Sequence, residues 1–213
     1  MTDLPYDAVA ASRAVATADP GMAETVARVG PPTITLRTDE TLPALLRAVT
    51  GQQLSVKAAA TIHGRVLDAF APDGALDARA LLDAPDDALR ACGLSRAKTA
   101  AVRDLARRQI DGTLPGRADL LAMPDDEVVR ALTAVRGVGV WTAQMMMIFN
   151  LGRPDVWPVA DLGVQEGVRI ARGLDTRPTA REMGPMGEVY APWRSVAAWY
   201  CWRTVHLARE DAS

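Results

Sequence analysis

Residues 132–143 read LTAVRGVGVWTA, a stretch in which one helical segment stops and another starts within a few positions. Gly137 and Gly139 are one residue apart, and glycine allows positive φ and a close approach of the backbone. The helix that follows begins with unpaired N–H groups and a partial positive charge, which suit one phosphate group. On the glycines alone, a plain corner between two helices is an equally good interpretation.

Helical patterns continue on both sides of this turn. From residue 41 onward, apolar residues recur at helical spacing almost without interruption. Pro85 and Pro124 are each followed by two aspartates, which is typical of the first turn of a helix. Before residue 41 we expect a helix near Met22–Val29 and a short extended piece at 33–36. The predicted fold class is all-α.

The composition sets limits on the function. The chain has 213 residues, 49% of them hydrophobic and 23% charged, as expected for a folded globular protein. A net charge of −2 means that any DNA-binding surface must be local. Cys92 and Cys201 are too few for an iron–sulfur cluster or a structural zinc site. No signal peptide or membrane span is evident, so we expect a cytoplasmic protein.

The string at 132–143 resembles the helix-hairpin-helix motif of DNA repair glycosylases, and the resemblance covers roughly residues 41–206. The branch most similar to it is bacterial 3-methyladenine DNA glycosylase II. The chain shares with that branch a Gly-Gln-rich helix start at 51–55, a basic turn at 93–98 and a late Pro-Trp-Arg-Ser segment at 192–195.

The resemblance implies a single glycosylase unit over residues 1–213, with two helical lobes, a helix-hairpin-helix motif and a cleft between the lobes. Residues 1–40 should pack with the C-terminal helices. Residues 41–150 should form one lobe that ends in the hairpin at 132–149. Residues 151–213 should hold the catalytic loop and the C-terminal helices.

Asp161 is the predicted catalytic residue. The family has a catalytic aspartate about 20 residues after the hairpin, and WPVADLGV at 157–164 fills that place. A carboxylate there can stabilise an oxocarbenium-like sugar and orient a water. Composition alone favours a simpler interpretation, in which Asp161 is the N-cap of a helix at 162–171.

The resemblance also predicts a pocket for an everted base, because the target atom cannot be reached inside a duplex. Trp141, Met145 and Trp202 are the predicted pocket residues, and indoles would attract a cationic base by about 0.5–2 kcal/mol. Members of the branch that the chain resembles carry a pocket tyrosine where this chain has Met145, a more adaptable side chain. For Trp193 and Trp199 we expect core packing.

Further DNA contacts are expected from the hairpin, from an inserted wedge residue and from a basic helix at 95–108. An alternative is that the charged face of this helix is only solvated surface. The predicted DNA-binding residues are Gly137, Gly139, Val140, Thr142, Gln53 or Leu54 as the wedge, Arg96 and Lys98.

No cofactor is predicted, and no side-chain metal site can be identified in the sequence. By resemblance alone, the backbone carbonyls of Leu132, Val135 and Val138 could bind a monovalent cation. Relatives that also nick the strand carry a Schiff-base lysine just after the hairpin, where this chain has Trp141. We therefore expect base release without strand cleavage.

The predicted function is that of a monofunctional glycosylase that removes alkylated purines of the 3-methyladenine and 7-methylguanine type. Its expected partner is double-stranded DNA containing alkylated bases, bound by a monomer near the nucleoid and away from membranes. Two alternatives are a glycosylase for another lesion, such as an etheno-adduct or a mismatch, and a non-catalytic DNA-damage-binding module.

Overall fold

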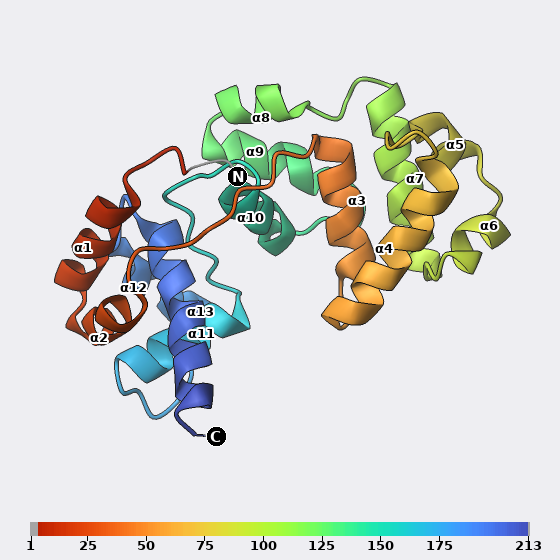
Figure 1. Ribbon diagram of the computed structural model, residues 1–213. Helices are drawn as coiled ribbons and strands as arrows, with labels where there is room; N and C mark the ends of the chain where they lie inside the picture. The colour runs from red at the N-terminus through yellow and green to blue at the C-terminus, as the bar shows by residue number, and fades with distance from the viewer. Residues whose placement is uncertain (1–3, 213) are drawn as a thin grey trace. The chain divides into compact units, whose positions relative to one another are not determined.

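The computed structural model describes residues 4–212, and over this range the prediction of an all-α fold is confirmed. The described residues form thirteen helices and no strand (Figure 1). No helix among them is both long enough and apolar enough to cross a bilayer. The helices are α1 (Ala8–Ala18), α2 (Pro20–Val29), α3 (Thr41–Gly51), α4 (Val56–Phe70), α5 (Ala78–Asp83), α6 (Asp86–Ala91), α7 (Arg96–Ile110), α8 (Arg117–Ala122), α9 (Asp125–Thr133), α10 (Val140–Phe149), α11 (Leu162–Ala171), α12 (Ala180–Glu188) and α13 (Arg194–Glu210).

The helices divide into two compact units. The terminal unit comprises the residues up to 37 and those from 147 onward. The central unit comprises residues 38–146. The boundary near residue 147 falls within α10, so the hairpin turn belongs to the central unit.

The terminal unit is built around the contact of α11 with α13. The two backbones approach closely at Gly167, where an added Cβ would lie only 2.3 Å from the carbonyl oxygen of Cys201. The N-terminal helices pack on the same core, and the hydroxyls of Thr25 and Thr204 lie 2.8 Å apart in a buried hydrogen bond. This packing fixes α11, which begins directly after Asp161, on the body of its unit.

The central unit has α7 near its middle, in contact with α3, α5 and α6. Its fully buried leucines come from several different helices: Leu45, Leu46, Leu81, Leu89, Leu105, Leu120 and Leu132. Burying such a side chain contributes about 1.5–3 kcal/mol each. The central unit therefore has a leucine-rich core of its own.

Two local features differ from the sequence-based expectation. Periodicity did not predict α1, which starts where Asp7 accepts hydrogen bonds from the amides of Val9 and Ala10. The extended piece at 33–36 forms no strand, although Leu36 is a bridge residue and is buried with Ile34. A single edge contact does not make a sheet, because a strand needs a partner along its length.

The two proline signals mark helix starts, but each proline is the N-cap and not, as predicted, a residue of the first turn. Pro85 and Pro124 are the N-cap residues of α6 and α9, with ψ near 151° and 152°. The aspartates that follow occupy the first turn, where the helix dipole favours a negative charge.

Candidate active site and nucleic-acid interface

Asp161 is the N-cap of α11, and its side chain is almost completely buried, with 8% of the residue exposed. One carboxylate oxygen, Oδ1, accepts a hydrogen bond of 2.8 Å from the amide of Val164. The same oxygen accepts a second bond of 2.9 Å from the indole Nε1–H of Trp202. The capping interpretation is thus correct, but the indole bond is more than a cap requires and fixes the orientation of the carboxylate.

Trp202 lies on α13 and is half-buried beside the first turn of α11. Phe149 stacks on it with ring centroids 5.7 Å apart and an angle of 27° between the planes. A Cβ added at Gly163 would lie 2.8 Å from Cδ1 of the indole and 3.1 Å from Oδ1 of Asp161. Gly163 therefore gives the indole room to reach the carboxylate.

The other tryptophans of the terminal unit are packing residues. Trp193 and Trp199 pack against its core, as expected, and Trp193 contacts the ring of Tyr6 at 5.6 Å between centroids. Trp157 is buried, and its Nε1–H donates to the carbonyl oxygen of Met183 at 2.7 Å. Trp202 thus differs from these three tryptophans in that its indole donates to Asp161.

The hairpin between α9 and α10 depends on Gly137 more than on Gly139. Gly137 has a φ of +79°, which side chains rarely adopt, and a Cβ there would lie 3.1 Å from Cβ of Ala101. Gly139 lacks a positive φ, and an added Cβ would contact nothing within 4 Å. The turn itself therefore requires a glycine at 137 and not at 139, while the DNA contact of both glycines stays a prediction.

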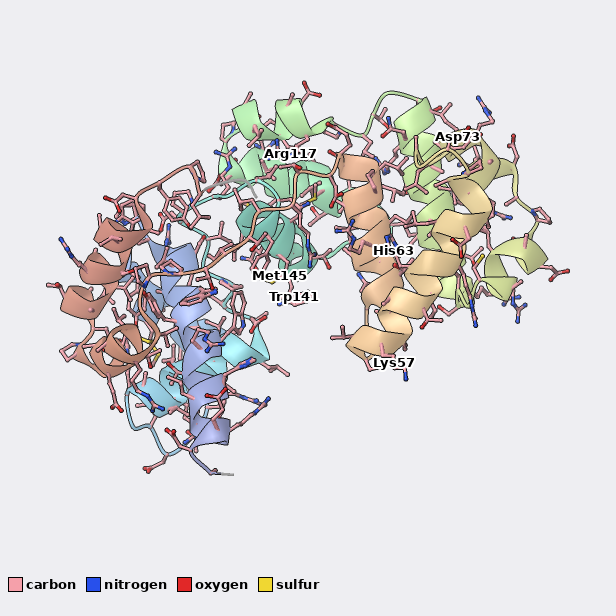
Figure 2. The ribbon with its side chains drawn as sticks, in the orientation of Figure 1. Lys57, His63, Asp73, Arg117, Trp141 and Met145 are labelled. Carbon is pink, nitrogen blue, oxygen red and sulfur yellow. The ribbon has the colours of Figure 1, made fainter. Side chains whose placement is uncertain are left out.

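The first residues of α10 differ in exposure. Val140 and Trp141 are 54% and 45% exposed, large fractions for side chains of this kind. Thr142 is buried, and its hydroxyl accepts a hydrogen bond of 3.5 Å from the side-chain nitrogen of Gln52, so the DNA contact of Thr142 stays a prediction. Met145 is half-buried one turn after Trp141, and both are labelled on α10 in Figure 2.

Both candidate wedge residues lie in the turn between α3 and α4. Gln53 is exposed and has a φ of +57°, a conformation that no other non-glycine residue in the described range adopts. Leu54 is 41% exposed. Strained residues of this kind often lie at functional sites, but which of the two enters DNA stays a prediction.

The basic helix at 95–108 is α7, and three of its five cations bind groups of the central unit. Lys98 donates to the carbonyl oxygens of Thr50 and Gln52. Arg103 pairs with Asp86, and Arg108 pairs with Asp104. Burial lowers the pKa of the Lys98 ammonium. A charge pattern cannot distinguish such internal contacts from a phosphate-binding face.

Arg96 and Arg107, by contrast, are exposed. Of the cations on this helix, these two are the ones whose side chains reach solvent most fully, which fits the predicted DNA contact of Arg96.

Two of the three hairpin carbonyls predicted to bind a cation accept hydrogen bonds within the hairpin. The Leu132 carbonyl accepts the amide of Val135, and the Val135 carbonyl accepts that of Val138. A carbonyl oxygen has two lone pairs, so these bonds are compatible with an added monovalent cation. Within residues 4–212, no group of three or more His, Cys, Asp or Glu side chains is placed to hold a metal ion.

Comparison with known proteins identifies the family. Residues 46–189 match the model of the HhH-GPD superfamily of base excision DNA repair proteins. Because this match covers more than half of the chain, the protein belongs to that superfamily. The match includes the hairpin, the Gln52–Leu54 turn and Asp161.

Particular relatives are similar over most of the chain. DNA-3-methyladenine glycosylase 1 of Schizosaccharomyces pombe is 34% identical over 83% of this chain and 78% of its own length. DNA-3-methyladenine glycosylase 2 of Escherichia coli is 28% identical over 78% of this chain and 58% of its own length. The solved structure of Schizosaccharomyces pombe 3-methyladenine DNA glycosylase in complex with abasic DNA superposes with a TM-score of 0.84 at 32% identity, covering 93% of this chain and 98% of that one.

Proposed function

We propose that this protein is a DNA glycosylase that hydrolyses the N-glycosidic bond of alkylated purines in duplex DNA, as the first step of base excision repair. The lesions are of the 3-methyladenine and 7-methylguanine type. We further propose that it acts as a monomer on the DNA of the nucleoid and leaves an abasic site without cutting the strand.

The observation that carries the proposal is the carboxylate of Asp161, held by the Val164 amide and the Trp202 indole at the start of α11. As the bond to the base breaks, the sugar develops positive charge, which an oriented carboxylate nearby stabilises. The bond's electron pair leaves with the base, and a water oxygen forms the new bond to the sugar carbon. The water loses a proton, which Asp161 accepts.

Alkylated purines need little further catalysis. Such a base already carries a positive charge, so the departing electron pair neutralises it and no strong general acid is required. Cation–π attraction from the exposed Trp141 would add to the preference for charged bases, by about 0.5–2 kcal/mol. Met145, one turn further on α10, would adapt to bases of different shape.

The number and the positions of the lysines support the proposal that the protein lacks lyase activity. Lys57 and Lys98 are the only lysines in the sequence, and Trp141 occupies the position where relatives that cut the strand carry one. The amine of Lys98 is bound to two backbone carbonyls. Formation of a Schiff base requires an amine that is free to reach the sugar, and the hydrogen bonds to Thr50 and Gln52 hold the Lys98 amine within the central unit.

The decisive experiment is Asp161→Asn, assayed in single turnover on duplex DNA containing 7-methylguanine. Asparagine caps a helix about as well as aspartate, so this variant keeps the fold and removes the charge. We expect base release to slow by at least about 100-fold. Asp7→Asn, at the N-cap of α1, is the matched control and should retain wild-type activity.

Three outcomes would each overturn a part of the proposal. If the wild-type protein releases neither 3-methyladenine nor 7-methylguanine, the substrate assignment is wrong. If Asp161→Asn and wild type release base at equal rates, Asp161 is only a cap. Strand scission by the pure protein without heat or alkali would refute the monofunctional mechanism.

A further inference from the structure

Lys98 lies at the C-terminal end of α3. Its Nζ donates hydrogen bonds of 2.9 Å to the carbonyl oxygens of Thr50 and Gln52, and α3 ends at Gly51 between them. The last four carbonyls of a helix lack partners within the helix and carry a partial negative charge. The Lys98 ammonium, supplied by α7, donates hydrogen bonds to two of these carbonyl groups at the helix end and neutralises their partial negative charge.

The residue that follows these carbonyls is strained. Gln53 has a φ of +57°, which L-residues other than Asn and Asp rarely adopt. The carbonyl of Gln52 and the amide of Gln53 share one rigid peptide plane. A hydrogen bond that fixes this plane therefore helps to hold Gln53 in its unusual conformation, and with it the exposed side chains of Gln53 and Leu54.

The same turn is connected to the hairpin. The side-chain amide of Gln52 donates 2.9 Å to the carbonyl oxygen of Gly137. On α7, Asp104 accepts the backbone amide of Arg136 at 2.9 Å. The hydrogen bonds from Arg136 and Arg108, working against burial, hold the pKa of Asp104 below its ordinary value. The turn after α3 and the hairpin are thus both fastened to α7.

We propose that Lys98 is a positioning residue, whose ammonium fixes the conformation of the Gln52–Leu54 turn. Together with Gln52 and Asp104, it keeps this turn in a fixed position relative to the hairpin. Lys98 accordingly does not contribute a phosphate contact. The inference rests on the proposed function in that these two segments are the ones expected to meet DNA.

The test compares Lys98→Met, which keeps the unbranched stem and removes the charge and the donors, with Arg96→Gln two residues earlier on α7. Hydrogen exchange on the free protein is measured first. We expect amides in residues 49–54 of Lys98→Met to exchange at least tenfold faster than in wild type, with the rest of the core unchanged. In Arg96→Gln the exchange in residues 49–54 should match wild type.

Duplex binding at several salt concentrations gives the second measurement. A side chain that contacts one phosphate adds about 0.9 to the slope of log K against log salt. Lys98→Met should keep the wild-type slope, whereas Arg96→Gln should lower it by about one. In single turnover, Lys98→Met should release base about tenfold more slowly, and Lys98→Arg, which retains N–H donors, should recover part of the loss.

The proposal is overturned if residues 49–54 of Lys98→Met remain protected, or if the variant loses about one unit of salt slope. If Lys98→Met does not fold, Gln52→Met tests the link between the turn and the hairpin. In this variant the amides of residues 136–139 should exchange faster, while those of residues 49–51 keep their protection. Unchanged protection of residues 136–139 refutes the proposal. Exchange needs neither DNA nor activity, so it decides the role of Lys98 even if the proposed function fails.

Discussion

The Asp161 site and the hairpin are held in place by different means. In the terminal unit, the key group is a buried side chain fixed by another side chain, the indole of Trp202, 41 residues further along the chain. In the central unit, the key groups are backbone atoms in an exposed turn, fixed by Gln52 and Asp104. Chemistry at a sugar requires one oriented charge, whereas binding a phosphate requires only a correctly shaped main chain. Changes in the first region should therefore alter rates, and changes in the second should alter affinity.

The largest effect, after that of Asp161 itself, is expected for Trp202→Phe. The variant keeps a ring to stack on Phe149 but loses the indole N–H, and a hydrogen bond to a charged group contributes about 1.5–3 kcal/mol. The single-turnover rate on 7-methylguanine DNA at saturating enzyme should fall about 10- to 100-fold. Trp199→Phe, on the same helix and packed against the same core, is the control. An unchanged rate for Trp202→Phe would mean that the indole does not orient the carboxylate.

A smaller loss of rate, about tenfold, is expected for Gly163→Ala. The new Cβ would lie 2.8 Å from Cδ1 of Trp202, so the indole must shift away from Asp161. Gly184→Ala in α12 is a matched control, because a Cβ there contacts nothing within 4 Å. Single-turnover rates and melting temperatures of both variants distinguish a shifted indole from a destabilised protein. If both variants keep the wild-type rate, the close approach at Gly163 is unimportant for chemistry.

Gly137→Ala should affect binding and leave the rate of the bound complex near that of wild type. An alanine at a φ of +79° costs about 1–2 kcal/mol, and its Cβ would press on Ala101. We expect duplex affinity to fall about fivefold, measured by fluorescence anisotropy, together with a lower melting temperature. Gly139→Ala should bind nearly as well as wild type, because neither strain nor a close contact applies there. Equal losses for the two variants would contradict this account of the hairpin.

The smallest effect concerns acid stability and the terminal unit alone. Asp19 is buried, which raises its pKa, but hydrogen bonds from Tyr190 and Arg172 outweigh burial and hold the pKa below its ordinary value. A depressed pKa contributes stability that is present above about pH 4 and is lost as the pH falls through the folded-state value. Urea midpoints of wild type and Asp19→Asn should therefore differ at pH 7 and converge toward pH 2–3. A constant difference across this range would show that Asp19 is not charged in the folded protein.

Much of the helical framework follows from local sequence. The helix predicted at 162–171 has the same limits as α11, and the one predicted at 95–108 agrees with α7 within two residues at its end. The hairpin and the capping position of Asp161 were also predicted. Capping and helical periodicity act over about four residues, so a short window of sequence contains the information.

What the sequence could not provide are contacts between distant segments. Nothing in the pattern around Asp161 predicts that Trp202 donates to it, or that Gly163 makes room for that bond. Likewise, the charge of Lys98 gives no sign that its partners are two carbonyls at the end of α3, 46 and 48 residues away in the chain.

The sequence by itself determined where several of the helices begin, that the chain turns between residues 137 and 139, and which carboxylate opens α11. Only the tertiary structure decided which charges act inside the protein and which reach solvent. The physical reason is that backbone hydrogen bonds in helices are local, whereas the partner of a buried polar side chain depends on which helices pack together.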